Sequence, residues 1–360
     1  MDATVTYLTI PILSLVFVII LTLPIRILAK KIKLVDNPNA RKVHSTPVPL
    51  IGGISILISS FLALLFSPEF RMSYSEYYVL IIGSTILLLI GVIDDKMQVN
   101  SILKLIIQIA LAYFVFDSGI RIESLFGVFG IHELSIYVQY FLTIVVIVGV
   151  INAFNLMDGI DGLAAGLAII GLSAFAVIAF ITSNTFIAVM YLSLIGGLVG
   201  FLKFNLSKKH KIFMGDAGST VIGFIMIVSG IMLIQSAAGT TNLSLTLEVV
   251  IGVLSLPVID SLRVYRRRIK TGYSPFRADK THFHHLVLYL GINHKLASLL
   301  IVVISLTIAL SAIIFGTLFN LTLAVLSILV LFMAVSKLIA LNYQISNWKT
   351  KLKALEELQN

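Results

Sequence analysis

Side chains that could do chemistry gather in four short segments of an otherwise apolar chain. The first segment is Asp94-Asp95-Lys96, with Lys104 in the apolar stretch that follows. Adjacent carboxylates raise each other's pKa unless a cation or a donor offsets their charge. A cation within an apolar span costs about 2–3 kcal/mol near the membrane centre and less toward its surface, so Lys104 needs a partner such as a phosphate. This segment favours a phosphate or metal site over a solvated helix end paired only with Lys96.

The second segment carries an amide or a carboxylate at every third position: Asn152, Asn155, Asp158 and Asp161. In a helical turn this spacing drifts slowly around the axis, so we expect the four side chains to converge on one cavity. Gly159 and Gly162 would let a ligand approach the backbone closely. A turn rich in Asn and Asp with helix caps would explain one or two of these residues and leaves the others unexplained.

The third segment, Gly215-Asp216-Ala217-Gly218-Ser219, follows Lys208, Lys209 and Lys211. Asp216 could serve only as a helix N-cap. An Asp beside glycines and a positive helix terminus also describes a site for a phosphate and a metal ion. Taken alone, the segment does not distinguish these two interpretations. The other three polar segments favour the phosphate and metal site.

The fourth segment is a long inner loop predicted over 261–296, in which a cluster of arginines precedes a cluster of histidines. The side chains that could do chemistry in it are Arg263, Arg266, Arg267, Arg268, His282, His284 and His285. Three histidines in four residues could bind a transition metal. No Cys accompanies them, and neighbouring histidines on a helix point apart, so contacts to phosphate or sugar fit better. For the arginines taken alone, a charged surface loop is the favoured interpretation.

Together the segments offer hard oxygen ligands and several cations, with no Ser–His–Asp order typical of hydrolases. That combination is typical of phosphoryl transfer with Mg²⁺, in which positioning and charge neutralisation do most of the catalytic work.

The elements that position these segments must lie in a membrane. Of the 360 residues, 58% are hydrophobic and 12% are charged, far from the composition of a soluble domain. The apolar runs leave no stretch for a second folded domain, so residues 1–360 are predicted to form one all-α polytopic membrane domain. About eleven transmembrane helices are expected, at 4–27, 50–67, 76–93, 101–117, 136–153, 163–182, 185–202, 217–236, 244–260, 297–316 and 318–340.

The distribution of basic residues predicts the orientation of these helices. An odd helix number puts the termini on opposite sides, and 24 of the 26 Lys and Arg residues then share one face, with only Arg71 and Arg121 on the other. This asymmetry places the N-terminus outside and the C-terminus in the cytoplasm. The expected active face consists of the inner segments 28–49, 94–100, 152–162, 203–216 and 261–296. The outer segment 118–136 is predicted as a short β-hairpin.

The positions of the charged residues also argue against two classes of function, nucleic-acid binding and transport. Topology accounts for most of the net charge of +9, so no nucleic-acid partner is expected. The middles of the spans carry almost no ionisable side chains, which disfavours a transporter or a flippase for anionic lipid-linked sugars. That class is kept as the competing hypothesis. The absence of Cys excludes disulfides and sulfur redox chemistry.

Four motifs in order resemble those of the polyprenyl-phosphate N-acetylhexosamine-1-phosphate transferases. They are Asp94-Asp95-Lys96, the run from Asn155 to Gly162, Gly215-Asp216 with the following Ala-Gly-Ser, and Ser274-Pro275-Phe276 with His282 to His285. The resemblance spans the chain, including the helix number and the outside N-terminus. The histidine segment looks like that of the undecaprenyl-phosphate GlcNAc-1-phosphate transferases, with the phospho-MurNAc-pentapeptide transferases as the alternative. Phe283 stands where many relatives carry a smaller aliphatic residue.

The resemblance implies an enzyme with a glycosyltransferase-4 type domain in the bacterial cytoplasmic membrane. It would transfer a sugar phosphate from a UDP-N-acetylhexosamine to undecaprenyl phosphate, as the first membrane step of a cell-envelope glycopolymer. Asp216 and Asn155 would hold Mg²⁺, with Mn²⁺ as an alternative, and Lys104 would contact phosphate. With Lys104, the residues expected to be catalytic are Asp94, Asp95 and Asp158. Those expected to bind substrate are Asn152, Asp161, Arg266, Arg268, His282, His284 and His285. A homodimer is also expected.

The roles of the two adjacent acids are left open between positioning and proton abstraction. A phosphate monoester has its second pKa near 6 and is mostly dianionic at pH 7, so it does not need a base. We therefore expect Asp94 and Asp95 to position the lipid phosphate and Lys104. Asp161 is expected to help bind uracil, and the histidine segment to cover the sugar and the diphosphate.

Overall fold

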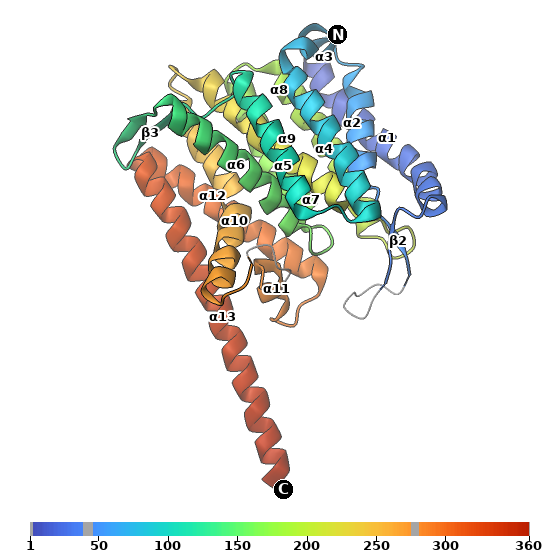
Figure 1. Ribbon diagram of the computed structural model, residues 1–360, viewed down its shortest axis with the longest axis vertical. Coiled ribbons are helices and arrows are strands. Elements are labelled where there is room, and N and C mark those ends of the chain that lie inside the picture. The colour runs from blue at the N-terminus through green and yellow to red at the C-terminus, as the bar shows by residue number, and fades with distance from the viewer. Residues whose placement is uncertain (1–2, 39–45, 275–280, 360) are drawn as a thin grey trace.

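The computed structural model describes residues 3–38, 46–274 and 281–359 as a bundle of helices with two small β-ladders (Figure 1). The first half contains α1 (Ala3–Lys31), β1 (Val35–Asp36), β2 (Val48–Pro49), α2 (Gly52–Leu64), α3 (Pro68–Ser73), the 3-10 helix η1 (Tyr74–Tyr77), α4 (Tyr78–Met97), α5 (Ser101–Asp117), β3 (Ser124–Val128), β4 (Ile131–Glu133) and α6 (Ile136–Met157). The second half contains α7 (Leu163–Ile181), α8 (Thr185–Asn205), α9 (Gly215–Ala237), α10 (Leu243–Lys270), α11 (Phe283–Leu288), α12 (His294–Leu318) and α13 (Leu321–Gln359).

Within the described residues, nine helices are long and apolar enough to cross a membrane: α1, α4, α6, α7, α8, α9, α10, α12 and α13. The helices α2 and α5 occupy two other predicted spans. They have 13 and 17 residues, fewer than the roughly 20 that a crossing needs. The polytopic all-α membrane fold is thereby confirmed, whereas the count of eleven crossings and their direction stay predictions.

Helix α9 forms the centre of the bundle and is buried along almost its whole length. It packs against α2, α4 and α6. Glycines allow two close contacts with α9. A Cβ at Gly53 of α2 would overlap Gly218, and a Cβ at Gly91 of α4 would overlap Ala217. These contacts hold the N-terminus of α9 beside the C-terminal end of α4, where the first and third polar segments lie.

Two other groups of helices complete the bundle. Helix α8 packs against α1, α2 and α7, and α10 packs against α12, α6 and α13. The two chain ends lie at opposite ends of the molecule, and α13 continues well beyond the bundle (Figure 1).

The short strands β1 and β2 pair antiparallel, with Val35 opposite Pro49. The chain after β2 then joins the segment before α9. The backbone N–H of Phe213 donates to the carbonyl of Pro49 at 2.9 Å, and the N–H of Gly52 donates to the carbonyl of Phe213 at 2.8 Å. These bonds tie the start of α2 to the start of α9, so the glycine-rich third segment enters its helix in a defined position.

The segment 118–136, predicted as a hairpin, contains β3 and β4 paired antiparallel, with Ser124 opposite Glu133. Its end contacts α13, because the backbone N–H of Phe129 donates to the Thr322 hydroxyl at 2.9 Å. Which side of the membrane it faces stays a prediction.

The expected long loop over 261–296 is wrong in its first third. Helix α10 continues to Lys270, so Arg263, Arg266, Arg267 and Arg268 lie on a helix, whereas Arg277 lies outside the described residues. Pro257 lies within α10 without ending it, no Gly or Pro follows before Lys270, and Arg is a good helix former. The helix ends just before Gly272, whose φ of +75° favours glycine.

Candidate active site

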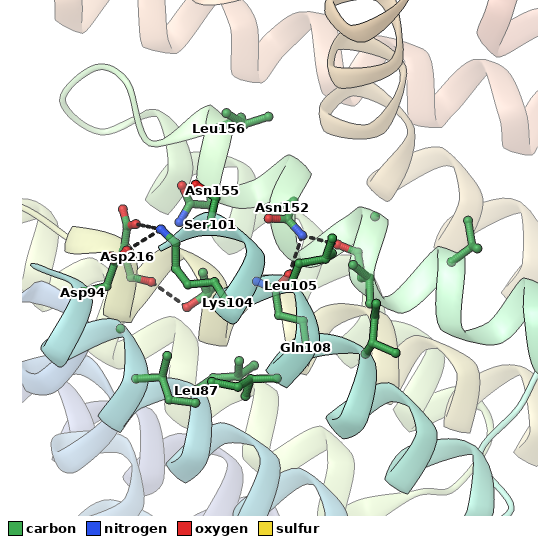
Figure 2. Close-up of a pocket in the computed structure, with 18 of the residues that line it drawn as sticks. Leu87, Asp94, Ser101, Lys104, Leu105, Gln108, Asn152, Asn155, Leu156 and Asp216 are labelled. Atoms are coloured by element: carbon green, nitrogen blue, oxygen red, sulfur yellow. Dashed lines mark hydrogen bonds and ion pairs between the residues drawn. The ribbon is translucent and has the colours of Figure 1, made fainter. Parts of the chain in front are cut away.

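A cavity of about 450 Å³ opens where α4, α5, α6, α9 and α10 meet (Figure 2). Apolar side chains of α4, α5 and α6 form much of its wall. Its polar wall consists of Asp94, Ser101, Lys104, Gln108, Asn152, Asn155, Asp216, Thr220, Tyr265 and Arg268. The structure therefore brings side chains from all four predicted segments to one cavity.

Lys104 joins two carboxylates at this cavity, as Figure 2 shows. It lies in the first turn of α5, with its Nζ 2.5 Å from Asp94 Oδ2 and 3.3 Å from Asp216 Oδ2. Asp94 Oδ1 also accepts the backbone N–H of Val99 at 2.7 Å, and its side chain is 6% exposed. The Asp216 side chain is 39% exposed. Asp94 is thus held in place, whereas Asp216 keeps acceptor capacity for a ligand.

The adjacent acids Asp94 and Asp95 have different surroundings. Asp95 turns away to the start of α9, where Oδ1 accepts the N–H of Asp216 at 2.9 Å and Oδ2 accepts the N–H of Ala217 at 3.3 Å. Gly215 has a φ of +76°, and a Cβ there would overlap the Asp95 carboxylate. Asp95 therefore caps α9 from another helix and fixes the position of Asp216.

Asn152 and Asn155 project into the cavity from the last turns of α6. The Asn152 amide donates to Gln108 Oε1 at 2.7 Å and to the carbonyl of Val148 at 2.8 Å. Gln108 comes from α5, one turn after Lys104. The Asn152 amide of α6 is therefore joined to α5 through Gln108.

The expectation that four residues of the second segment converge on one cavity holds for Asn152 and Asn155 only. Helix α6 ends at Met157, and Asp158 follows as its C-cap with a ψ of 46°. The helical spacing of three therefore stops before Asp158. Among the described residues, neither Asp158 nor Asp161 lines the cavity.

Asp158 still belongs to the same acidic environment. Burial raises its pKa to about 7, and the nearby carboxylates of Asp216, Asp95 and Asp161 act in the same direction. A carboxyl group with this pKa changes its charge near neutral pH.

Asp161 lies on the turn between α6 and α7 and pairs with a cation of the third segment. Lys211 Nζ is 2.6 Å from Asp161 Oδ2, and the Asp161 carbonyl accepts the Ser298 hydroxyl at 2.7 Å. Next to this pair, the buried Asn205 accepts the N–H of Gly162 at 2.7 Å and donates to the carbonyl of Ile212 at 3.0 Å. Two interactions therefore join the turn to the segment that precedes α9.

The histidine segment is anchored by Asp260 of α10, a residue that the sequence reasoning missed. His282 Nδ1 lies 3.0 Å from Asp260 Oδ2, and the N–H of Phe283 donates to the same carboxylate at 3.1 Å. Arg263 Nη2 lies 2.6 Å from Asp260 Oδ1 and also donates to the carbonyl of Thr281 at 2.6 Å. His282 is buried and does not line the cavity.

His284 is buried against Gly159, where a Cβ would overlap the imidazole. Its Nδ1 has no hydrogen-bond partner among the described residues. Burial, followed by the neighbouring histidines, lowers the pKa of His284 to about 3, so the ring is neutral at physiological pH. The histidine segment and the second segment are therefore in direct contact.

The other predicted residues of this region lie around the cavity. Arg266 is exposed on the last turns of α10, and His285 is half-buried on α11 with its ring 4.3 Å from that of His284. Pro275 and Phe276 of the fourth motif lie outside the described residues, as do Arg41 and Lys42 of the basic face.

Gln108 and Asp260 are the main omissions of the sequence reasoning. Gln108 is a single polar residue within an apolar stretch, and Asp260 lies at the end of one; this was the available signal, because a polar group within a span needs a partner. Asp260 also precedes Arg263 by three residues, a spacing at which helical side chains pair.

Comparisons with known proteins show which family the chain resembles. The profile described as glycosyl transferase family 4 matches residues 77–234, which contain three of the four polar segments. The chain is 35% identical over 330 residues to the "probable undecaprenyl-phosphate N-acetylglucosaminyl 1-phosphate transferase" of Bacillus subtilis, covering 90% of this chain and 89% of the relative. It is 35% identical to the undecaprenyl-phosphate alpha-N-acetylglucosaminyl 1-phosphate transferase of Haemophilus influenzae, covering 78% and 79% of the two chains. For the Escherichia coli K12 protein of that name the identity is 30%, with 77% and 75% covered.

Proposed function

Because the chain belongs to glycosyl transferase family 4, we propose that it transfers GlcNAc-1-phosphate from UDP-GlcNAc to undecaprenyl phosphate and releases UMP. The observation that carries this proposal is the cavity in which Asp94, Lys104, Asp216 and Arg268 meet above an apolar wall. A lipid phosphate needs both parts of such a site: charged groups for the phosphate and apolar side chains for the prenyl chain.

The proposed reaction exchanges one diphosphate for another. A phosphate oxygen of the lipid attacks the β-phosphorus of UDP-GlcNAc, and the bond from that phosphorus to the oxygen shared with the α-phosphorus breaks. UMP leaves with the electron pair, and the product is a polyprenyl diphosphate sugar. Lys104 and Arg268 approach the cavity from different helices and stabilise the negative charge of the phosphates.

In this proposal Asp94 orients Lys104, and Asp95 acts through α9 by positioning Asp216. The lipid phosphate is already mostly dianionic at neutral pH, so a base is not required. The short contact between Asp94 and Lys104 supports the positioning role.

Mg²⁺ is the proposed cofactor, with Mn²⁺ as an alternative, and Asp216 and Asn155 are the residues that would hold it. A half-exposed carboxylate and an amide on one cavity wall are hard oxygen donors of the kind that Mg²⁺ prefers. Among the described residues, no group of three His, Cys, Asp or Glu side chains could hold a metal ion. This fits an ion that takes most of its ligands from water and phosphate. When bound, it would neutralise charge on the diphosphate.

The remaining predicted contacts complete the proposal. Asp161 would help to bind uracil, and Asn152, Asp158, Arg266, His282, His284 and His285 would act near the sugar and the diphosphate. The contact between His284 and Gly159 supports a shared site for the second and fourth segments.

The active site is proposed to face the cytoplasm, with the N-terminus outside and β3–β4 on the outer side of a bacterial cytoplasmic membrane. The concentration of Lys and Arg on one side of the predicted spans supports this orientation. The opposite positions of the two chain ends are consistent with it (Figure 1).

A homodimer joined through α13 is proposed as the assembly. One side of α13 packs on the bundle, where the Tyr343 ring lies 4.6 Å from that of Tyr289. The other side exposes apolar residues spaced by three and four positions: Leu338, Leu341, Ile345 and Trp348. Leu352 and Leu355 continue this spacing in the sequence, as in a coiled coil. A second copy of the chain would cover this stripe.

Disulfide cross-linking can test the dimer, since the chain has no Cys of its own. In oxidised membranes, Trp348→Cys should form a dimer and Tyr343→Cys, on the side that packs on the bundle, should not. Equal cross-linking of both variants, or none with Trp348→Cys, would contradict the proposed contact.

The activity is tested by UMP release from purified protein in detergent with undecaprenyl phosphate and Mg²⁺. Release that requires the lipid and UDP-GlcNAc supports the proposal. Release from UDP-MurNAc-pentapeptide instead would assign the alternative transferase. No release from any UDP-sugar would overturn the enzyme and bring the transporter hypothesis forward.

A further inference from the structure

Asp260 is the most completely enclosed acid near the cavity, although it does not touch it. Its side chain is 0% exposed, and the residue lies in the second half of α10. Its two oxygens contact Arg263, the His282 ring and the N–H of Phe283. An ionised carboxylate satisfied in this way accepts hydrogen bonds and does not donate them.

These contacts select one tautomer of His282. Because Asp260 accepts at Nδ1, the proton of the neutral ring lies on Nδ1, and Nε2 is left as an acceptor. Nε2 faces Arg268, whose Nη2 lies 3.4 Å away. A guanidinium only donates, so this tautomer matches Arg268 and the opposite one does not.

Arg268 extends this chain of contacts to the cavity wall. It is 5% exposed, lies over the Tyr265 ring at 5.8 Å and lines the cavity. A free Arg side chain loses rotamer entropy when it binds a phosphate, so a guanidinium that is already held loses less.

From this geometry we propose that Asp260 is a positioning residue: through the tautomer of His282, it holds the Arg268 guanidinium in place for the phosphates of the substrates. The ligand class is the diphosphate of the nucleotide sugar or the phosphate of the lipid. Only the kinetic test below rests on the proposed function.

The kinetic test compares Asp260→Asn, Arg268→Gln and the double variant by UMP release. Asp260→Asn keeps the shape of the side chain but brings an N–H group toward His282. We expect kcat/KM to fall about tenfold to a hundredfold, as when an outer partner of a ligand-binding side chain is lost. In the Arg268→Gln background, the same change should cost less than about threefold, because the group that Asp260 positions is already gone.

The matched control is Glu248→Gln, an equally buried acid in the first part of α10, far along the helix from the cavity. It should leave kcat/KM unchanged. If the losses of Asp260→Asn and Arg268→Gln multiply in the double variant, Asp260 acts independently of Arg268 and the proposal is overturned. Should Asp260→Asn not be recovered folded, His282→Gln replaces it in the same cycle, with the same expectation.

A spectroscopic test is independent of turnover. In protein labelled with ¹⁵N-histidine, His282 should show a protonated Nδ1 and an unprotonated Nε2, with its signals identified by their loss in His282→Gln. In Asp260→Asn the proton should move toward Nε2. A ring already protonated on Nε2 in the wild-type protein would overturn the proposed role of Asp260 even if transferase activity is found. Absence of activity with the expected tautomer would overturn the proposed function alone.

Discussion

Two carboxylate clusters lie near the same cavity but differ in how well their charge is compensated. At Asp260, one fully buried carboxylate has Arg263, an imidazole and a backbone N–H around it. At Asp216, two carboxylates share Lys104, and the Asp216 side chain is 39% exposed. The Asp260 oxygens are fully used in hydrogen bonds within the protein, so they cannot bind a ligand. The Asp216 carboxylate still has acceptor capacity that a ligand can use. Asp260 therefore holds other residues of the site in place, whereas Asp216 is available to contact a ligand.

The strongest test of this difference is Asp216→Asn, which keeps the side-chain shape and removes the charge. We expect UMP release to fall about a hundredfold to a thousandfold, the range for losing one key electrostatic group in an active site. Asp117→Asn, at an exposed helix end away from the cavity, is the control. Wild-type turnover by Asp216→Asn would remove Asp216 from the reaction.

Asp94→Asn should lower the rate about a hundredfold, because Lys104 loses the negative charge of its partner at 2.5 Å. Positioning predicts a similar loss at every pH. A base predicts a loss concentrated at low pH, where the lipid phosphate is protonated. The rate of both proteins measured from about pH 5.5 to 8.5 distinguishes the two roles.

For thermal stability, we expect substitution of Asp260 to have a larger effect than substitution of Asp216. Asp260→Ala leaves Arg263 and a backbone N–H without their buried acceptor, and breaking such a pair costs about 3–5 kcal/mol. Its apparent melting temperature in detergent should fall by several degrees. Asp216→Ala removes repulsion between carboxylates and should melt at or above the wild-type temperature. A larger fall for Asp216→Ala would reverse the comparison.

The pH dependence of stability reports on Asp158. Its folded-state pKa of about 7 lies above the ordinary value of 3.8, so the folded protein binds this proton more tightly than the unfolded chain. The associated stability is complete below about pH 4 and is lost as the pH rises through about 7. Melting temperature against pH should therefore fall less for Asp158→Asn than for the wild type. Parallel curves would show that Asp158 does not titrate in this range.

The smallest effect is expected from Lys211→Met, which removes the partner of Asp161. The pair is partly exposed, and such pairs contribute up to about 1 kcal/mol, or about a fivefold change. KM for UDP-GlcNAc should rise by about this factor with kcat nearly unchanged. A loss in kcat alone would place Lys211 in the chemical step instead.

Much of the site was predictable from the sequence, because charged and amide side chains in an apolar chain indicate a functional site even when their positions in space are unknown. Asp94, Lys104, Asn152, Asn155, Asp216 and Arg268 were expected at the site and line one cavity. The placement of Asp158 and Asp161 was not predictable, because the three-residue spacing has meaning only while the helix continues, and α6 ends at Met157.

By itself, the sequence determined the membrane environment and the chemical groups available, since both depend on composition and on the length of apolar runs. Tertiary structure alone decided which acid of an adjacent pair faces the cavity. Asp94 meets Lys104 and Asp95 caps α9 because Gly91 lets α9 pack closely against α4. It also decided that Asp260 reaches His282, 22 residues away. Such contacts depend on how helices are rotated and packed, which local sequence patterns do not encode.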